Sequence, residues 1–494
     1  MAKKQFKAES KRLLDLMVNS IYTHHEIFLR EIVSNASDAC DKLCYKALTD
    51  ESVGLDRKDF FIELKTDKDA RLLTVSDNGI GMDREDLENN LGVIASSGSF
   101  QFKQELGDDA KDTDVIGQFG VGFYSAFMVA DHITVVTKKY GCDTAYMWQS
   151  AGADGYTVTE CEKDGVGTDV ILHLRADTDA EKFSEYLEGW RIQELIRKYS
   201  DYIRFPIRME VSKTRRKEGS PDDKPEYETY TEVETLNSMV PIWQRPKSKV
   251  TKEEYDKFYR DKFNDYADPQ RVLRVSAEGA VTYTALLFVP SQQPFNYYSR
   301  DFEAGLQLYS SGVLIMDKCA DLLPEHFRFV RGVVDSPDLS LNISRELLQH
   351  DRQLKVIAAN LDKKIRADLA KMMKDEPEEY AKFWKNFGRQ IKYGVVSDFG
   401  AHKQDLQDLL LFYSSTEKKP VSLADYVSRM KEGQEVIYYA AGESVESIDR
   451  LPQLEALKDA GTEILYFTED VDEFAAQTLT AYQEKKFQSA LSGD

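Results

Sequence analysis

Three polar residues in one short stretch have the types and the spacing to bind a ligand. Glu31, Asn35 and Asp38 are four and three residues apart, which in a helix places their side chains within roughly 60° of one another. A carboxylate or amide that is buried without a partner is costly, so such a stripe on the core-facing side of a helix indicates a ligand. An amide oxygen beside carboxylates suits a hard cation such as Mg²⁺, and one acid would remain to orient a water molecule. A solvated helix face is the alternative.

A second group of residues lies at the end of a predicted strand. Leu73, Val75 and Asp77 alternate along the chain, so Asp77 continues an apolar row on one face of the strand. A carboxylate in that position can accept a hydrogen bond from an amino group, such as the exocyclic amine of adenine. Gly79 and Gly81 follow and would let the backbone approach a flat ring closely. A common Asp-Asn-Gly turn is the alternative for this stretch.

A glycine-rich segment before a helical pattern could bind phosphate. Gly117, Gly120 and Gly122 would expose N–H groups at the positive end of a helix. The segment is neither a Walker loop, since no Gly-Lys-Ser/Thr follows, nor a dinucleotide fingerprint, since the glycine spacing is reversed. Just before it, residues 92–114 combine small and charged residues and predict either a lid or a surface loop. Thr168 opens a later strand and could add a hydroxyl near the ring.

Composition and charge limit the classes of protein. The chain has 494 residues, 42% of them hydrophobic and 31% charged, which excludes a mostly disordered or fibrous chain. Its 86 acidic residues outnumber 65 basic ones, and the net charge of −21 opposes non-specific binding to nucleic acid or anionic lipid. Five scattered cysteines imply no disulfide framework. Because the sequence shows neither a signal-peptide pattern nor an apolar run of the ~18 residues that a membrane helix needs, we predict a cytoplasmic protein.

The elements that must position these residues are a mixture of helices and strands. Apolar spacing predicts a long helix over residues 9–44 and a second helical region over 180–200. Short strands rich in β-branched residues are predicted between them, at residues 60–65, 71–77, 131–138, 143–149 and 168–174. This pattern predicts an α+β fold, a two-layer sandwich of helices against a largely antiparallel sheet rather than a βαβ relay.

A charged stretch, residues 213–235, follows this first domain (1–212) and predicts either a linker or an exposed hairpin. We expect residues 236–494 to form a second, α/β domain, with a large α/β part to about residue 350, a helical connector to about 412 and a small α/β part to 494. The elements expected there are strands over 274–290 and 305–317, helices over 344–373 and 377–412, strands near 436–440 and 463–467, and a last helix over 471–490.

In sequence order, the motifs resemble the nucleotide-binding domain shared by gyrase, heat-shock protein 90, sensor histidine kinases and mismatch-repair ATPases. The segments FLREIVSNASDA, VSDNGIGM, NNLGVIASSG and IGQFGVGFYS are most similar to heat-shock protein 90. The resemblance continues through DLSLNISRELLQ, residues 338–349, to the end of the chain, and the short charged stretch is similar to the bacterial form. It implies an ATP-dependent molecular chaperone of the stress response, with ATP or ADP and Mg²⁺ as ligands.

The resemblance also implies roles for individual residues. Glu31 would be the general base, with Arg30 restraining its carboxylate, and Asn35 would bind Mg²⁺. Asp77 would hold the adenine amine, and Thr168 would support that contact through water. The pocket around base, sugar and α-phosphate would be lined by Asp38, Gly81, Met82, Asn90 and Phe123. The glycines that would close around the phosphates are Gly117, Gly120 and Gly122.

Arg345 would reach the γ-phosphate from the middle domain, with Asn342 and Gln349 shaping its loop. Phosphoryl transfer mainly needs positioning and charge neutralisation, so this arginine would tie hydrolysis to domain docking. Two features depart from the family. Ser96 stands where a lid lysine is usual, so we expect one phosphate contact and the lid kinetics to differ. The chain ends at Asp494, without the family's C-terminal dimerisation domain, so we expect a mainly monomeric, slow ATPase from a protein that is a homodimer at full length.

The expected partners are unfolded or partly folded client proteins and co-operating chaperones, with no nucleic acid and no membrane span. Candidate client contacts, which an α/β core would explain equally well, are Trp243, Tyr266, Phe295, Tyr297 and Tyr298. Three other functions would use a similar nucleotide site. They are a DNA-transacting ATPase of the gyrase or mismatch-repair type, a protein kinase of the histidine type, and an adaptor that binds nucleotide without turnover.

Overall fold

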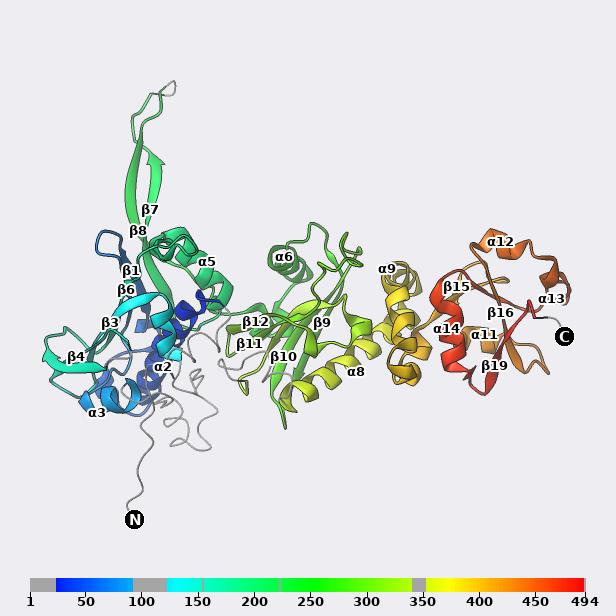
Figure 1. The fold of residues 1–494 in the computed structure, drawn as a ribbon, viewed down its shortest axis with the longest axis horizontal. Coiled ribbons are helices and arrows are strands. Elements are labelled where there is room, and N and C mark those ends of the chain that lie inside the picture. Colours follow the sequence, from blue (N-terminus) through cyan, green and yellow to red (C-terminus); the bar gives the residue numbers. More distant parts are fainter. Residues whose placement is uncertain (1–23, 92–121, 153–154, 222–223, 340–351, 493–494) are drawn as a thin grey trace, which may run out of the picture.

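The structure, a computed structural model, describes residues 24–91, 122–152, 155–221, 224–339 and 352–492. Three sheets follow one another along the long axis of an elongated molecule (Figure 1). We refer to the parts built on the sheets of eight, five and six strands as the first, second and third units. No helix within the described ranges is both long enough and apolar enough to cross a membrane. The mixture of sheets and helices confirms the predicted α+β class.

The first sheet carries the predicted nucleotide-binding motifs. Its strand order is β5-β4-β3-β6-β2-β1-β7-β8, and all neighbours are antiparallel except β1 and β7. In chain order the strands are β1 Ile62–Asp67, β2 Leu72–Asp77, β3 Ala130–Lys138, β4 Ala145–Ser150, β5 Tyr156–Cys161, β6 Gly167–Leu174, β7 Ile207–Arg216 and β8 Tyr227–Thr235. The sequence pattern located β1 to β4 and β6 within about two residues. It missed β5 and the first part of β7, residues 207–212.

Helix α2 (Ile27–Ala47) forms the second layer, against β2 and β6 and beside α5 (Gly189–Tyr199). It packs on the sheet through buried apolar residues such as Phe28 and Ile32. The prediction of one continuous helix over residues 9–44 is wrong at residues 24–26, which form the turn before α2. The apolar spacing continues across this turn, which is why periodicity alone did not locate the break.

Strands β7 and β8 continue past the sheet as a long hairpin, which projects from the first unit (Figure 1). Ion pairs across it join Lys213 to Glu232 at 3.0 Å and Arg215 to Glu228 at 2.7 Å. The charged stretch 213–235 therefore forms an exposed hairpin, the second of its two predicted structures. Because β7 pairs with β1, the hairpin crosses the predicted boundary at residue 212.

The second sheet has the order β12-β11-β13-β10-β9, with β11 and β13 parallel. Its elements are α6 Lys252–Phe263, β9 Pro269–Ala277, β10 Tyr283–Pro290, β11 Leu306–Ser310, β12 Val313–Cys319 and β13 Arg331–Asp335. The sequence pattern missed α6 and β13. Trp243, Tyr309 and Leu314 of this unit belong to the same buried apolar cluster as Ile196 of the first unit. One hydrophobic core thus continues from the first unit into the second.

Two long helices, α8 (Arg352–Asp375) and α9 (Pro377–Val396), connect the second unit to the third. Pro377 begins α9, as predicted, because its missing N–H is not needed in the first turn. The helical pattern predicted to residue 412 ends earlier, in the short α10 (Lys403–Leu406) and the first strand of the third sheet.

The third sheet has the order β15-β14-β17-β16-β19-β18. Its elements are β14 Leu411–Ser414, β15 Pro420–Ser422, α11 Leu423–Ser428, β16 Val436–Ala441, α12 Val445–Asp449, α13 Glu455–Asp459, β17 Leu465–Phe467, α14 Asp470–Leu479, β18 Ala481–Tyr482 and β19 Lys485–Ser489. The predicted last helix over 471–490 is wrong beyond Leu479. Thr480 has a φ of 63°, and the chain turns back so that Tyr482 is buried.

Candidate active site

Glu31 and Arg30 lie buried near the start of α2. Arg30 donates two hydrogen bonds to Oε1 of Glu31, from Nε at 3.0 Å and from Nη2 at 2.5 Å. A third donor of Arg30, Nη1, bonds the main-chain oxygen of Leu314 in β12 at 3.2 Å. The other oxygen of Glu31, Oε2, lies where a Cβ atom on Gly122 would overlap it. Arg30 thus fixes one oxygen of the carboxylate, and Gly122 leaves room for the other.

The polar stripe is present on α2, but its members differ in exposure. Glu31 and Asp38 are buried, whereas Asn35 between them is exposed. The stripe continues to Lys42, which lies 11 residues after Glu31 and hence at nearly the same angle around the helix. Burial lowers the pKa of Lys42, while the carboxylates of Asp38 and Asp86 act in the opposite direction. Lys42 was not among the predicted site residues, although its spacing from Glu31 would have identified it.

Asp77 ends β2 in a row of three polar residues that crosses the sheet. Its partner on β6 is Thr168, whose partner on β3 is Thr137. Oδ1 of Asp77 accepts a hydrogen bond from the N–H of Gly79 at 2.9 Å, and the hydroxyls of Thr168 and Thr137 are 2.9 Å apart. Thr137 also accepts from the N–H of Met82 at 2.9 Å. Thr137 was not predicted, because nothing in the sequence distinguishes it from the other residues of its strand.

The surroundings of Asp77 disfavour its charge. Burial raises the pKa of the Asp77 carboxyl to about 7, although the hydrogen bond from Gly79 lowers it. Asp169 raises this pKa further, and Lys163 opposes that effect. A buried carboxyl needs hydrogen-bond partners, and strongly perturbed pKa values are typical of functional sites. A carboxyl with a pKa of about 7 is partly protonated at neutral pH.

Two glycines bring the end of β2 against its neighbours. A Cβ atom on Gly79 would overlap the main chain of Ala39 in α2, and the N–H of Ile80 donates to the oxygen of Ala39 at 2.9 Å. Gly81 has a φ of 67°, and a Cβ atom there would overlap the main-chain oxygen of Lys138. Only glycine permits both close approaches. The contact at Gly79 places the end of β2 against Ala39 of α2, the residue after Asp38, and the contact at Gly81 places it against β3.

Asn90 and Phe123 also lie in this part of the first unit. Oδ1 of Asn90 is buried and has no hydrogen-bond partner among the described residues, which makes it a candidate ligand contact. Phe123 belongs to a 3₁₀-helix, Gly122–Met128, where the sequence predicted a helical pattern. Its ring lies 5.7 Å from that of Tyr124 and 5.5 Å from that of Trp148. Phe123 is therefore part of an aromatic cluster with Tyr124 and Trp148.

Several predicted residues lie outside the described ranges, so their placement stays a prediction. They are Ser96, Gly117, Gly120, Asn342, Arg345 and Gln349.

The five candidate client residues fall into two groups. Trp243 and Tyr297 are only 1% exposed, so the interpretation of these two as surface aromatics is wrong, and both belong to the core. Tyr266 and Phe295 are 97% and 103% exposed, and Tyr298 is also exposed. The sequence could not separate the groups, because polar residues surround both.

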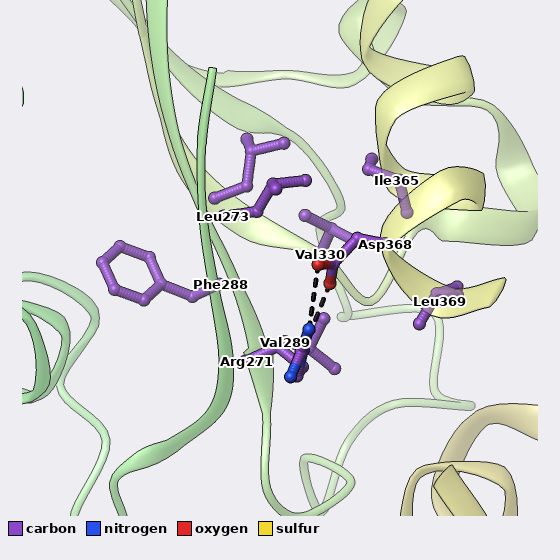
Figure 2. Close-up of a pocket in the computed structure, with 9 residues that line it drawn as sticks. Arg271, Leu273, Phe288, Val289, Val330, Ile365, Asp368 and Leu369 are labelled. Atoms are coloured by element: carbon purple, nitrogen blue, oxygen red, sulfur yellow. Dashed lines mark hydrogen bonds and ion pairs between the residues drawn. The ribbon is translucent and has the colours of Figure 1, made fainter. Parts of the chain in front are cut away.

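A small cavity lies in the second unit, where β9 and β10 face α8 (Figure 2). Arg271 closes one side of it through two hydrogen bonds to Asp368, at 2.9 and 3.2 Å. Apolar side chains such as Leu273 and Ile365 line the rest. The cavity volume of about 10 Å³ leaves room for about one water molecule. We therefore assign this cavity to packing and not to nucleotide binding.

Comparisons with known proteins identify the family of this chain. The family described as "Histidine kinase-, DNA gyrase B-, and HSP90-like ATPase" matches residues 22–163, and the family "Hsp90 protein" matches residues 185–230 and 220–494. Three relatives are each named Chaperone protein HtpG. The one from Bacillus subtilis (strain 168) is 58% identical to this chain, and those from Alkaliphilus metalliredigens (strain QYMF) and Clostridium acetobutylicum are each 57% identical. Each alignment covers 100% of this chain and 78% of the relative. These matches disfavour a DNA-transacting ATPase. The chain belongs to the Hsp90 family and is an ATP-dependent molecular chaperone with ATPase activity.

Proposed function

We propose that ATP is hydrolysed where α2 meets the end of β2, with Glu31 as the general base. The observation that supports this role is the pair of hydrogen bonds by which Arg30 fixes one oxygen of a buried carboxylate, beside a glycine at position 122. A carboxylate held in this way can orient a water molecule and accept its proton as the water attacks the γ-phosphorus. The bond to the β–γ bridging oxygen then breaks, and ADP leaves with the electron pair.

Asp77 is the proposed recognition residue for adenine. Its carboxylate would accept a hydrogen bond from the exocyclic amine, and Thr168, its partner across the sheet, would support that contact through a water molecule. Guanine carries a carbonyl oxygen where adenine carries this amine, so two hydrogen-bond acceptors, the carbonyl and the Asp77 carboxylate, would face each other. The site would therefore reject guanine nucleotides, because a buried acceptor without a donor is costly.

Asn35 is the proposed protein ligand of Mg²⁺. Its exposed amide, one turn from Glu31, offers the hard oxygen donor that this ion takes, and Mg²⁺ commonly binds proteins through few side chains together with phosphates and water. A second amide oxygen, Oδ1 of Asn90, is buried and has no hydrogen-bond partner within the described part of the chain, so it is also available to a ligand. When bound, the ion would neutralise phosphate charge.

The remaining predicted residues complete the proposal. Asp38, Gly81, Met82, Asn90 and Phe123 would line the nucleotide pocket, and Gly117, Gly120 and Gly122 would close around the phosphates. Arg345 would contact the γ-phosphate from the middle domain and so couple hydrolysis to domain docking. The division into an ATP-binding domain, a charged segment and a middle domain, the homodimer of the full-length form and the cytoplasmic location also stay predictions.

Client proteins would contact the exposed aromatic residues of the second unit. Tyr266, Phe295 and Tyr298 carry this proposal, because each presents apolar surface to solvent.

Two variants test the catalytic proposal. Glu31→Ala should bind ADP as the wild type does but lose turnover by a factor of about 10² or more, since it removes the group that accepts the proton. Glu446→Ala, which changes an exposed acid of the third unit, is the matched control. Calorimetric titration would measure ADP affinity, and phosphate release would measure turnover. Unchanged hydrolysis in Glu31→Ala would remove Glu31 from the mechanism.

A further inference from the structure

Lys262 on α6 contacts both the first and the second unit. Its Nζ donates a hydrogen bond to Oη of Tyr309, on β11, at 2.8 Å. The same ammonium group lies 5.5 Å from the ring centroid of Tyr309 and 5.5 Å from that of Tyr202, which follows α5 in the first unit. The Trp243 ring packs on both tyrosines, at 4.7 Å from Tyr202 and 5.3 Å from Tyr309. One cation thus joins aromatic residues from the two units.

Two carboxylates also act on Lys262, Asp201 from the first unit and Asp317 from β12. Burial lowers the pKa of Lys262 and raises the pKa of Asp201, so for both groups desolvation outweighs the attraction between them. Two partly buried charges of opposite sign add little net stability, but removing either one leaves the other buried without its partner. Lys262 therefore selects one arrangement of the two units rather than strengthening the fold as a whole.

The hairpin formed by β11 and β12 connects this contact to the proposed catalytic acid. Gly312, in its turn, has a φ of 81°, and a Cβ atom there would lie 2.5 Å from the main-chain oxygen of Tyr202. Two residues later, the main-chain oxygen of Leu314 accepts the third hydrogen bond of Arg30. Because Tyr309 and Leu314 belong to the same hairpin, a shift of that hairpin against Tyr202 also moves the acceptor of Arg30.

We propose that Lys262 is a positioning residue for ATP hydrolysis. It holds the β11–β12 hairpin against Tyr202, and through the oxygen of Leu314 the hairpin holds Arg30 on the carboxylate of Glu31. This inference rests on the proposed role of Glu31. Lys262 does not contact the adenine end of the site at Asp77, so its loss should lower turnover and leave nucleotide affinity unchanged.

The test compares Lys262→Met with Lys257→Met, which changes an exposed lysine of the same helix. In Lys262→Met, kcat should fall about tenfold, equivalent to about 1.4 kcal/mol, while the Kd for ADP stays within about twofold. Amide hydrogen exchange of residues 311–316 should become faster in Lys262→Met and not in the control. Tyr309→Phe, which keeps the ring and removes the acceptor, should change both measurements in the same direction. Lys262→Arg, which keeps the cation, should restore at least half of the lost turnover.

Two results would overturn the proposal. One is a Lys262→Met protein with wild-type kcat and wild-type exchange in the hairpin. The other is faster exchange throughout all three units, which would show a general loss of stability. The same variants distinguish this proposal from the proposed role of Glu31. If Glu31 is not the general base, Glu31→Ala would keep its turnover. Amide exchange of the hairpin in Lys262→Met would still report the contact with Tyr202.

Discussion

Affinity for adenine nucleotides should fall as the pH drops below 7, because the proposed adenine contact needs Asp77 in its ionised form. Burial raises the pKa of this carboxyl to about 7 in the protein without nucleotide. An amine that donates to the carboxylate favours the ionised form, so binding at acid pH must release the proton. With a pKa of about 7, about nine-tenths of the molecules are ionised at pH 8 and about one-tenth at pH 6. The affinity should therefore differ about tenfold between these pH values, or about 1.4 kcal/mol.

Calorimetric titration with ADP, in buffers of different ionisation enthalpy, measures both this affinity and the number of protons released. Because the phosphates of ADP also titrate in this range, Asp77→Asn is the control. The asparagine can keep the bond from Gly79 through its oxygen, but it then turns an amide N–H towards the donating amine, so its affinity should be weaker at every pH. The dependence that remains in this variant belongs to the nucleotide. Identical pH profiles in the two proteins would refute the assignment of Asp77.

The same pKa has the opposite consequence for the protein without nucleotide. The folded protein holds the proton of Asp77 up to about pH 7, whereas the unfolded chain releases it near 3.8. Between these values the folded state binds more protons, so the contribution of Asp77 to stability decreases as the pH rises from 3.8 to about 7. Urea unfolding of the wild type and of Asp77→Asn across this range would show the difference, and parallel curves would contradict it.

Three further changes have defined outcomes. Lys392 is buried and pairs with the buried Asp472 at 2.6 Å. Lys392→Met should therefore lower the free energy of unfolding, measured by urea titration, by about 3–5 kcal/mol. A loss below about 1 kcal/mol would show that Asp472 does not need this cation. Hydrogen bonds from Lys198, Tyr199 and Arg191 lower the pKa of Glu26 to about 2 against the effect of burial. Glu26→Gln should therefore cost about 1–2 kcal/mol at pH 7 after screening by solvent, and the difference from the wild type should disappear as the pH falls from 4.5 to about 2. Arg345→Ala should lower phosphate release with little change in ADP affinity, and full activity would make this arginine structural.

The fold was predictable where a pattern has a single physical cause. Runs of β-branched residues between turn residues located β1 to β4 and β6, because such side chains fit a half-buried strand. Strand β5 was missed because it is an edge strand with mostly exposed residues, so it has no apolar row. The last predicted helix failed because helical spacing continues past Thr480, whereas a positive φ at that residue ends the helix. Such a backbone reversal has no signal in apolar spacing.

The site was predictable to the extent that its residues are consecutive or regularly spaced. The stripe of α2 and the row that ends in Asp77 could both be found in the sequence, and the structure places them side by side through Gly79. The contact between Arg30 and Leu314 could not be predicted from the sequence, because it joins residues 284 positions apart and its acceptor is a main-chain oxygen. No side-chain type marks an acceptor of that kind.

The apolar cluster shared by Ile196, Trp243 and Leu314 has a consequence for how the protein responds to heat. If one of the first two units unfolded alone, the cluster residues of the folded unit would become exposed to water. The two units should therefore melt in a single calorimetric transition, even though each has its own sheet. A protease that cuts between them would then act mainly on molecules in which both have already unfolded.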